Sequence, residues 1–311
     1  MLLFYFYCFL VKMNHLTDSF PMPSISFTTK ESLQAWMIEQ IQKQGPQADL
    51  NAADVSNIRD FSFLCISSEL EEQRVLSQFN GDLSKWDMSN ASILNYMFAG
   101  SVFNGDLSKW NVSNVTQMAG MFQESFFNQP LNSWDVSKVH DMRAMFFKSP
   151  FNQPLDRWNT SNAVGLSGMF KDCPFNQDIS SWDVSRAQNM SEMFLRSSFN
   201  QPLSTWSVAN VMNMARMFEQ SSFNHSLEDW ELRHIRNVEQ MFFNSQFNHA
   251  LPFLPTDARQ KNCLNFSALW RSLGAPSEYN WNHLRALQQG VLMEQRLSAY
   301  DDTPQPLKRR L

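Results

Sequence analysis

The chain has 311 residues, of which 43% are hydrophobic, and a formal net charge of −5 at pH 7. This length and hydrophobic content suffice for a substantial buried core. The acidic balance excludes the basic composition typical of proteins that follow the phosphates of a nucleic acid, so we expect no nucleic-acid partner.

Residues 1–27 open with the apolar run MLLFYFYCFLVK. Such a run is typical of a signal-peptide core, but no Lys or Arg precedes it and no small-residue cleavage site follows it. It is also shorter than the roughly 20 apolar residues that span a bilayer. No later stretch is a better candidate, so we expect no integral membrane segment. Two interpretations remain: an export signal or anchor, or a leader that is bypassed when translation starts at Met13.

Residues 28–49 predict an N-terminal helix that covers the first repeat. Thr28 and Glu31 have the spacing of a capping box, and Gly45 followed by Pro marks the end. An apolar stripe is formed by Leu33, Trp36, Met37 and Ile41.

Residues 50–254 consist of a unit that recurs at a constant interval, the one that separates Phe103 from Phe127. Phe-Asn opens each unit from Phe79 to Phe247, a Trp follows at a fixed place in all but the last, and Met-Phe recurs in the second half. Leu50–Cys65 is a degenerate first copy. The step from Ala53 to Trp86 is longer than the constant interval, which places an inserted polar loop or short helix between them. One unit cannot bury its apolar side chains alone, but stacked units can.

Two apolar periods alternate within each unit. Trp110 and Val112 are two residues apart, which is strand spacing, whereas the apolar residues from Val115 to Phe122 are spaced by three, three and one, which fits a short helix. The sequence therefore predicts an α/β fold. We expect an elongated leucine-rich-repeat-like solenoid of about eight 24-residue coils, with N- and C-terminal helical caps.

Three repeated positions have a structural and a functional interpretation. The Asn after each Phe is expected to satisfy backbone groups at a turn, because its side chain both donates and accepts. The Trp column is expected in the core, because Val shares its face, and a sugar-stacking platform is the alternative. His225 and His249 share one position in adjacent units, but a metal site would need further ligands, so polar turn residues are favoured.

The units, for example FNQDISSWDVSRAQNMSEMF from Phe175 to Phe194, resemble the BspA-like leucine-rich repeats of bacterial surface proteins, also known as the DUF285 type. The resemblance covers roughly residues 50–254. It implies an elongated surface, secreted or lipid-anchored protein that binds another protein, often a host component. The chain departs from that pattern in its lack of a convincing export signal and of a visible sorting motif, so a cytoplasmic location stays open.

The region after the repeats divides into two segments. Residues 255–300 predict a C-terminal cap, with an amphipathic helix from Ser277 to Tyr300, because terminal repeats need a cover. Residues 301–311 predict a disordered tail.

No catalytic motif or metal-ligand spacing stands out, and the four cysteines form no CxxC pair. We therefore expect a non-enzymatic protein without cofactor or metal, which binds a protein partner through the polar positions flanking each Trp. A carbohydrate-binding adhesin and an intracellular regulatory scaffold are the alternatives. The candidate partner-binding residues are Lys85, Asp87, Lys109, Asn111, Asp135, Arg157, Asn159, Asp183, Asp229 and Glu231.

Overall fold

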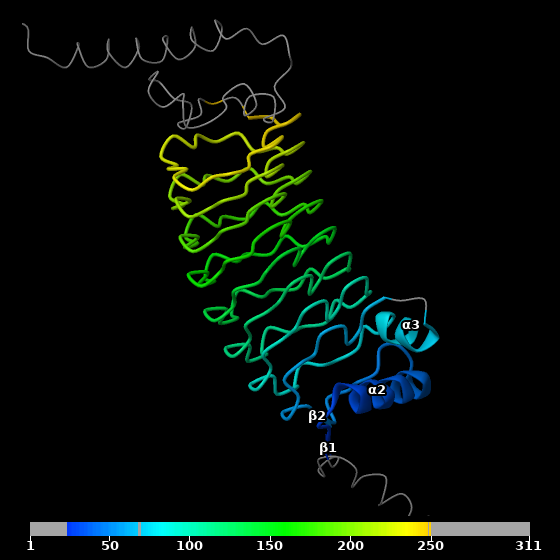
Figure 1. Cartoon of the computed structure of the whole chain (residues 1–311). Coiled ribbons are helices and arrows are strands. Elements are labelled where there is room, and N and C mark those ends of the chain that lie inside the picture. The colour runs from blue at the N-terminus through cyan, green and yellow to red at the C-terminus, as the bar shows by residue number, and fades with distance from the viewer. Residues whose placement is uncertain (1–23, 68–69, 248, 250–311) are drawn as a thin grey trace, which may run out of the picture.

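A computed structural model of the chain describes residues 24–67, 70–247 and 249. Its named elements are strand β1 (Ile25–Ser26), helix α2 (Lys30–Gln44), strand β2 (Ala53–Asp54) and helix α3 (Glu71–Ser77). Beyond α3 the chain winds as a stack of similar coils (Figure 1). The predicted C-terminal cap, the predicted tail and residues 1–23 lie outside the described residues.

Consecutive coils are joined by parallel bridges at one recurring position of the repeat, and Asp49 and Asp82 form a further parallel bridge outside that position. Each bridging residue pairs with its equivalent in the next repeat, and the step is constant except at the first bridge, which spans the insertion. This constant step confirms the repeat fold. The residues at this recurring position form the bridging column, which consists of Asp60, Ile93, Gln117, Asp141, Gly165, Asn189, Asn213 and Asn237.

The segment predicted as a short helix in each repeat is not helical, and this prediction was wrong. Alternate N–H groups point to the next coil: those of Leu94, Tyr96 and Phe98 donate to carbonyls of the following repeat at 2.8–2.9 Å. The N–H of Met97 closes a tight turn onto the carbonyl of Leu94. Tyr96, the third residue of that turn, has a φ of 55°, as a type II turn requires. Consecutive tight turns therefore reproduce the apolar spacing that a helix would give.

The segment predicted as a strand, around Trp110 and Val112, also makes no strand ladder. Its burial does alternate as predicted, with both residues buried and Asn111 exposed between them. The coils are linked here by a side chain instead: the indole Nε1 of Trp110 donates to the carbonyl oxygen of Leu83 at 2.9 Å. The pairing between coils thus lies in the other half of the repeat. From Phe79 onward, the described coils hold neither a helix nor a named strand, so the α/β label does not describe these coils.

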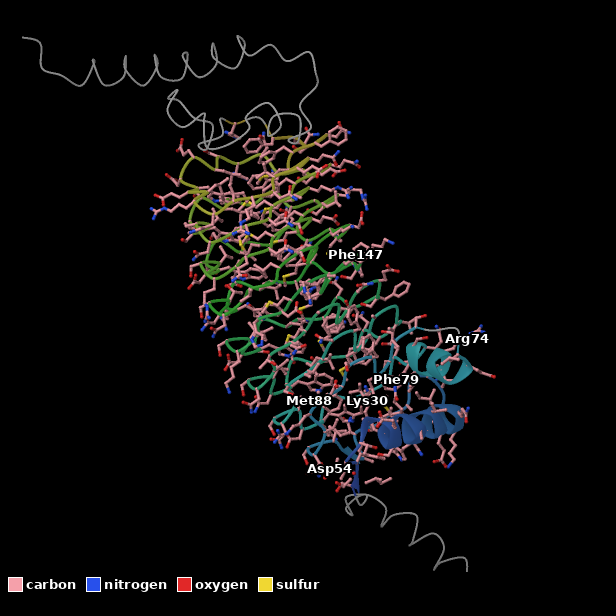
Figure 2. All side chains as sticks on the ribbon, viewed as in Figure 1. Lys30, Asp54, Arg74, Phe79, Met88 and Phe147 are labelled. Carbon is pink, nitrogen blue, oxygen red and sulfur yellow. The ribbon has the colours of Figure 1, made fainter. Side chains whose placement is uncertain are left out.

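The interior of the stack is filled by columns of aromatic and sulfur-containing side chains (Figure 2). Phe122 is fully buried, and its ring centroid lies 3.9 Å from that of Phe127 and 5.8 Å from that of Phe146. The rings of Trp110 and Trp134 stack at 6.5 Å with an interplanar angle of 2°. Full burial of each such side chain stabilises the fold by roughly 1.5–3 kcal/mol.

Helix α2 packs on the first, degenerate coil. Its buried residues Leu33, Met37 and Ile41 belong to the common core, and the amine of Lys30 donates to the carbonyl of Ser62. The helix begins one residue later than predicted, because the N-cap is Thr29, whose hydroxyl oxygen accepts the N–H of Ser32 rather than pairing with a glutamate. It ends at Gln44, and its C-cap residue Gly45 has a φ of 89°.

The repeated asparagines form a ladder that runs along the stack. The Oδ1 atom of Asn104 accepts the N–H of Asn128 at 2.8 Å, and Asn128 in turn accepts that of Asn152 at 2.9 Å. The predicted turn-satisfying role is therefore confirmed. The side chains are half-buried or exposed rather than fully buried.

We expect Asn128→Ala to lower the free energy of unfolding by about 1 kcal/mol, because the N–H of Asn152 loses its acceptor. Urea unfolding and hydrogen exchange of the Asn152 amide measure this effect. The matched variant Asn128→Asp keeps an acceptor oxygen at the same place and should retain most of the stability. Equal damage by both variants would show that the ladder bond is not what stabilises this turn.

Candidate interaction surface

The ten candidate partner-binding residues are all exposed. They occupy two positions of the repeat, one immediately before and one immediately after the buried Trp. The charge at each position changes along the stack: the residue before the Trp is Lys85 in one coil, Arg157 in another and Asp229 in a third. The set before the Trp is Lys85, Lys109, Arg157 and Asp229, and the set after it is Asp87, Asn111, Asp135, Asn159, Asp183 and Glu231.

The position after the Trp also has a local structural role that the sequence analysis missed. The Oδ1 atom of Asp135 accepts the backbone N–H of Ser137 at 3.0 Å, and that of Asp183 accepts the N–H of Ser185 at 2.9 Å. The same two-residue spacing recurs for Asp87, Asn111 and Asn159. The recurring Asp/Asn-x-Ser pattern could have revealed these turns, because such side chains commonly bond their own backbone two residues on.

These bonds hold the pKa of Asp135 below its ordinary value, because the hydroxyl of Ser137 and then its backbone N–H stabilise the carboxylate. A lowered pKa in the folded state stabilises the fold above the unfolded-state pKa, and this contribution is lost as the pH falls through the folded-state value. We expect Ser137→Ala to raise the pKa of Asp135, measured by NMR titration of its carboxyl carbon. Ser185→Ala is the matched control: it should raise the pKa of Asp183 and leave that of Asp135 unchanged.

A second row of asparagine side chains joins neighbouring coils, at the position three residues after the one that follows the Trp. The Nδ2 atom of Asn114 donates to the carbonyl of Ser89, and that of Asn162 donates to the carbonyl of Ser137, each at 2.7 Å. Lys138 and Arg186 replace Asn at this position, and their charged groups contact the Oδ1 atoms of Asn114 and Asn162. Lys138 and Arg186 thus place a positive charge in two of the coils, on the face that carries these asparagines.

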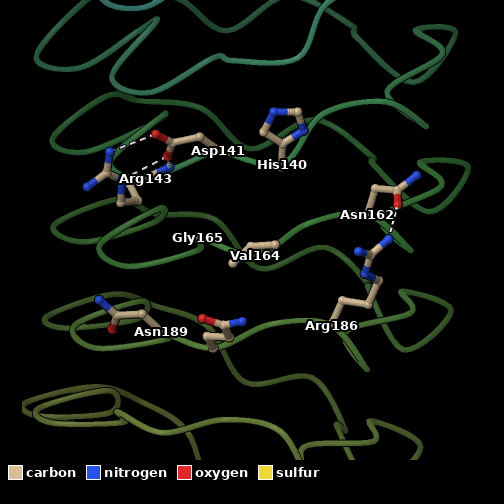
Figure 3. Close-up of a pocket in the computed structure, with 9 residues that line it drawn as sticks. His140, Asp141, Arg143, Asn162, Val164, Gly165, Arg186 and Asn189 are labelled. Carbon is tan, nitrogen blue, oxygen red and sulfur yellow. Dashed lines mark hydrogen bonds and ion pairs between the residues drawn. The ribbon is translucent and has the colours of Figure 1, made fainter.

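One hollow interrupts this face, with a volume of about 530 Å³ (Figure 3). Val164 lies between its two sides, and Gly165, a member of the bridging column, lies beside Asp141 and Arg143. The hollow is lined by His140, Asp141, Arg143, Asn162, Val164, Gly165, Arg186, Gln188 and Asn189.

The two arginines of the hollow have different partners. Arg143 is paired with a carboxylate: its Nε and Nη2 atoms lie 2.8 and 2.7 Å from the two oxygens of Asp141. Arg186 contacts a neutral acceptor, the Oδ1 atom of Asn162, at 2.5 Å. In the part of the chain that the structure describes, no carboxylate lies within ion-pair distance of Arg186.

The opposite half of the coil carries ion pairs that join neighbouring repeats. Arg196 contacts Asp172 through two hydrogen bonds, and Lys171 contacts Glu192 at 2.5 Å. Lys148 lies 3.6 Å from Glu124. Charges alternate in sign here and largely satisfy one another, so this side is a poorer candidate for recruiting a charged partner.

The Trp column is not a sugar-binding platform. Trp134, Trp158 and Trp182 are each 3% exposed, so their ring faces are covered by protein. The expectation of core packing is confirmed, and the carbohydrate-binding alternative is corrected because a sugar has no access to these rings.

The Nε2 atoms of the two repeated histidines each contact a backbone carbonyl. The Nε2 atom of His225 lies 3.0 Å from the carbonyl oxygen of Asn200, and that of His249 lies 3.1 Å from the carbonyl of Asn224. A carbonyl only accepts, so each Nε2 carries a proton and donates. Among the described residues, no group of three His, Cys, Asp or Glu side chains is placed to hold a metal ion.

Within residues 24–67, 70–247 and 249, no helix has the length and apolar character needed to cross a bilayer. No curated protein and no solved structure matched the chain. A family model described as "Mycoplasma protein of unknown function, DUF285" matches residues 70–174 and 147–253, which together make up more than half of the chain. The matches begin after the degenerate first coil, so the resemblance over residues 50–69 is not included in them. On this evidence the chain belongs to the DUF285 family.

Proposed function

We propose that the chain is a non-enzymatic, leucine-rich-repeat-like solenoid scaffold that binds another protein through the exposed positions flanking the Trp column. One observation carries the proposal: the buried side chains recur from coil to coil, whereas the exposed ones beside them change in charge. The repeat thus provides a rigid support on which a pattern of charges is displayed. Such extended, stacked surfaces are typical of the binding faces of repeat proteins.

The test uses the position before the Trp, because the position after it also holds turns together. Lys109→Glu, Arg157→Glu and Asp229→Lys are combined in one variant, and proteins captured from a lysate of the native organism are quantified by mass spectrometry. We expect proteins captured by the unmodified chain to be lost, with an unchanged thermal midpoint. The control variant Glu124→Lys with Lys148→Glu inverts one ion pair on the opposite side of the coil and should keep the capture. Unchanged capture by the triple variant would reject this face.

Location at the cell surface, secretion, or delivery as an effector is part of the proposal and is supported by the family resemblance. An intracellular regulatory scaffold is the competing proposal. Fractionation of the native organism, with mass-spectrometric identification of the mature N-terminus at Met1, Met13 or later, separates the two.

A further inference from the structure

The hollow around Gly165 is a gap in the bridging column. The corresponding residue is Asp141 in the coil before, and Asn189, Asn213 and Asn237 in the three coils after it. A Cβ atom added at Gly165 would lie 3.1 Å from Cγ of Arg143 and 3.3 Å from Oδ1 of Asp141. The absence of a side chain at Gly165 therefore leaves space that the stem of Arg143 and the carboxylate of Asp141 occupy at one edge of the hollow.

The charge inside the hollow is unbalanced. Of the two arginines in the lining, Arg143 is neutralised by Asp141, whereas Arg186 is held by the neutral amide of Asn162. The guanidinium of Arg186 therefore leaves one positive charge without a carboxylate partner among the described residues, on a chain whose net charge is −5. Figure 3 shows Arg186 and Asn162 on one side of the hollow, Asp141, Arg143 and Gly165 on the other, and Val164 between them.

We infer that this hollow binds a single carboxylate, the side chain of an aspartate or glutamate of the bound protein, through Arg186. A guanidinium presents parallel N–H donors that match the two oxygens of a carboxylate. Gln188 and Asn189 add neutral amide donors to the lining. A phosphate group is disfavoured, because its larger negative charge would meet only one cation that has no carboxylate partner among the described residues.

The inference rests on the proposed function, since the acidic side chain belongs to the captured protein. The test is therefore made with a small probe that needs no partner. N-acetyl-glutamate N-methylamide is titrated into the isotope-labelled full chain, and NMR follows the Nε–H group of Arg186 and the backbone amide of Gly165. The isosteric glutamine compound is the neutral control, and inorganic phosphate is the third ligand.

We expect saturable shifts at both groups with the glutamate probe and at least fivefold smaller shifts with the glutamine compound. Arg186→Gln should abolish the response at Gly165. Gly165→Asn should abolish the response at Arg186, because it restores the side chain that the next three coils carry at this position and fills the hollow. Arg186→Gln should keep the thermal midpoint of the unmodified chain. Gly165→Asn requires the side chain of Arg143 to shift, because a Cβ atom at residue 165 would lie 3.1 Å from Cγ of Arg143, so native circular dichroism is checked first for this variant.

Equal responses to the glutamate and glutamine compounds, an unaffected Arg186→Gln variant, or saturation by phosphate at lower concentration would each overturn the inference. These outcomes are separate from the fate of the proposed function. Protein capture that persists in a chain without a glutamate response leaves the scaffold proposal standing and refutes the carboxylate site. A glutamate response without any protein capture supports the carboxylate site and refutes the scaffold proposal.

Discussion

Replacing Phe146 by alanine is expected to lower the free energy of unfolding by about 3–5 kcal/mol, the cost of leaving a large cavity in a packed core. The side chain is fully buried, and its ring centroid lies 5.8 Å from that of Phe122 in the preceding coil and 5.7 Å from that of Phe170 in the following coil. The cavity would therefore remove packing from two neighbouring coils as well as from its own. Urea unfolding followed by circular dichroism measures the loss.

The next residue, Phe147, is the matched control. It is half-buried, and the amines of Lys148 and Lys171 lie 5.1 and 5.2 Å from its ring centroid. Phe147→Ala removes a partly exposed ring and these cation–π contacts, so we expect a loss of about 1 kcal/mol or less. The same chemical change at adjacent positions thus reports which side of the chain faces the core. Similar losses for both variants would contradict the inward orientation of the Met-Phe pair.

Deleting residues 151–174 is expected to give a shorter chain that still folds cooperatively. The deletion removes one period and joins Pro150 to Phe175, which recreates the Pro-Phe-Asn sequence found at both original boundaries. Each repeat contacts only its neighbours, so the coils on either side can pair directly. The bridge of Asp141 would then form with Asn189 in place of Gly165. We expect native-like circular dichroism and tryptophan emission that stays blue-shifted.

A half-period deletion of residues 151–162 is the control. It removes Phe151, Leu155 and Trp158 but leaves the second half of that coil, so the remaining apolar side chains face positions without partners. We expect loss of cooperative unfolding and red-shifted tryptophan emission. If the full-period deletion also failed to fold, the coils would be shown to depend on contacts beyond their nearest neighbours.

The sequence was sufficient to predict the direction in which each repeated side chain points. A residue type that recurs once in every repeat, such as the Phe of Phe103 and Phe127, occupies the same place in successive coils and stacks on its own copy, here at 6.5 Å. Large apolar side chains at such positions are therefore buried in the interior of the stack. For this reason the burial of the Trp column and the exposure of the flanking residues could be read before the structure was known.

The pairing segment could not be predicted in this way. Each tight turn contains one residue with a positive φ. A glycine at that position in every coil would have indicated a turn rather than a helix. Most coils have another residue there, such as Glu192 (φ 59°) or Arg216 (φ 57°), so the sequence did not indicate the turn. The chain tolerates this strain because the surrounding N–H groups are bound to the adjacent coil. Local spacing alone therefore favoured a helix that is not formed.

The amino-acid sequence by itself determined the repeat length, the inward columns and the varied outer positions, because burial of apolar side chains at a fixed period leaves one way of stacking them. Only the tertiary structure decided which half of each coil pairs with the next, how the two rows of asparagine side chains run, and where Gly165 opens a hollow beside Arg186. The physical reason is that the interacting residues lie in different repeats and are therefore far apart in the sequence. These features depend on hydrogen-bond partners and neighbours in the adjacent repeats, whose positions are fixed only when the coils are in contact.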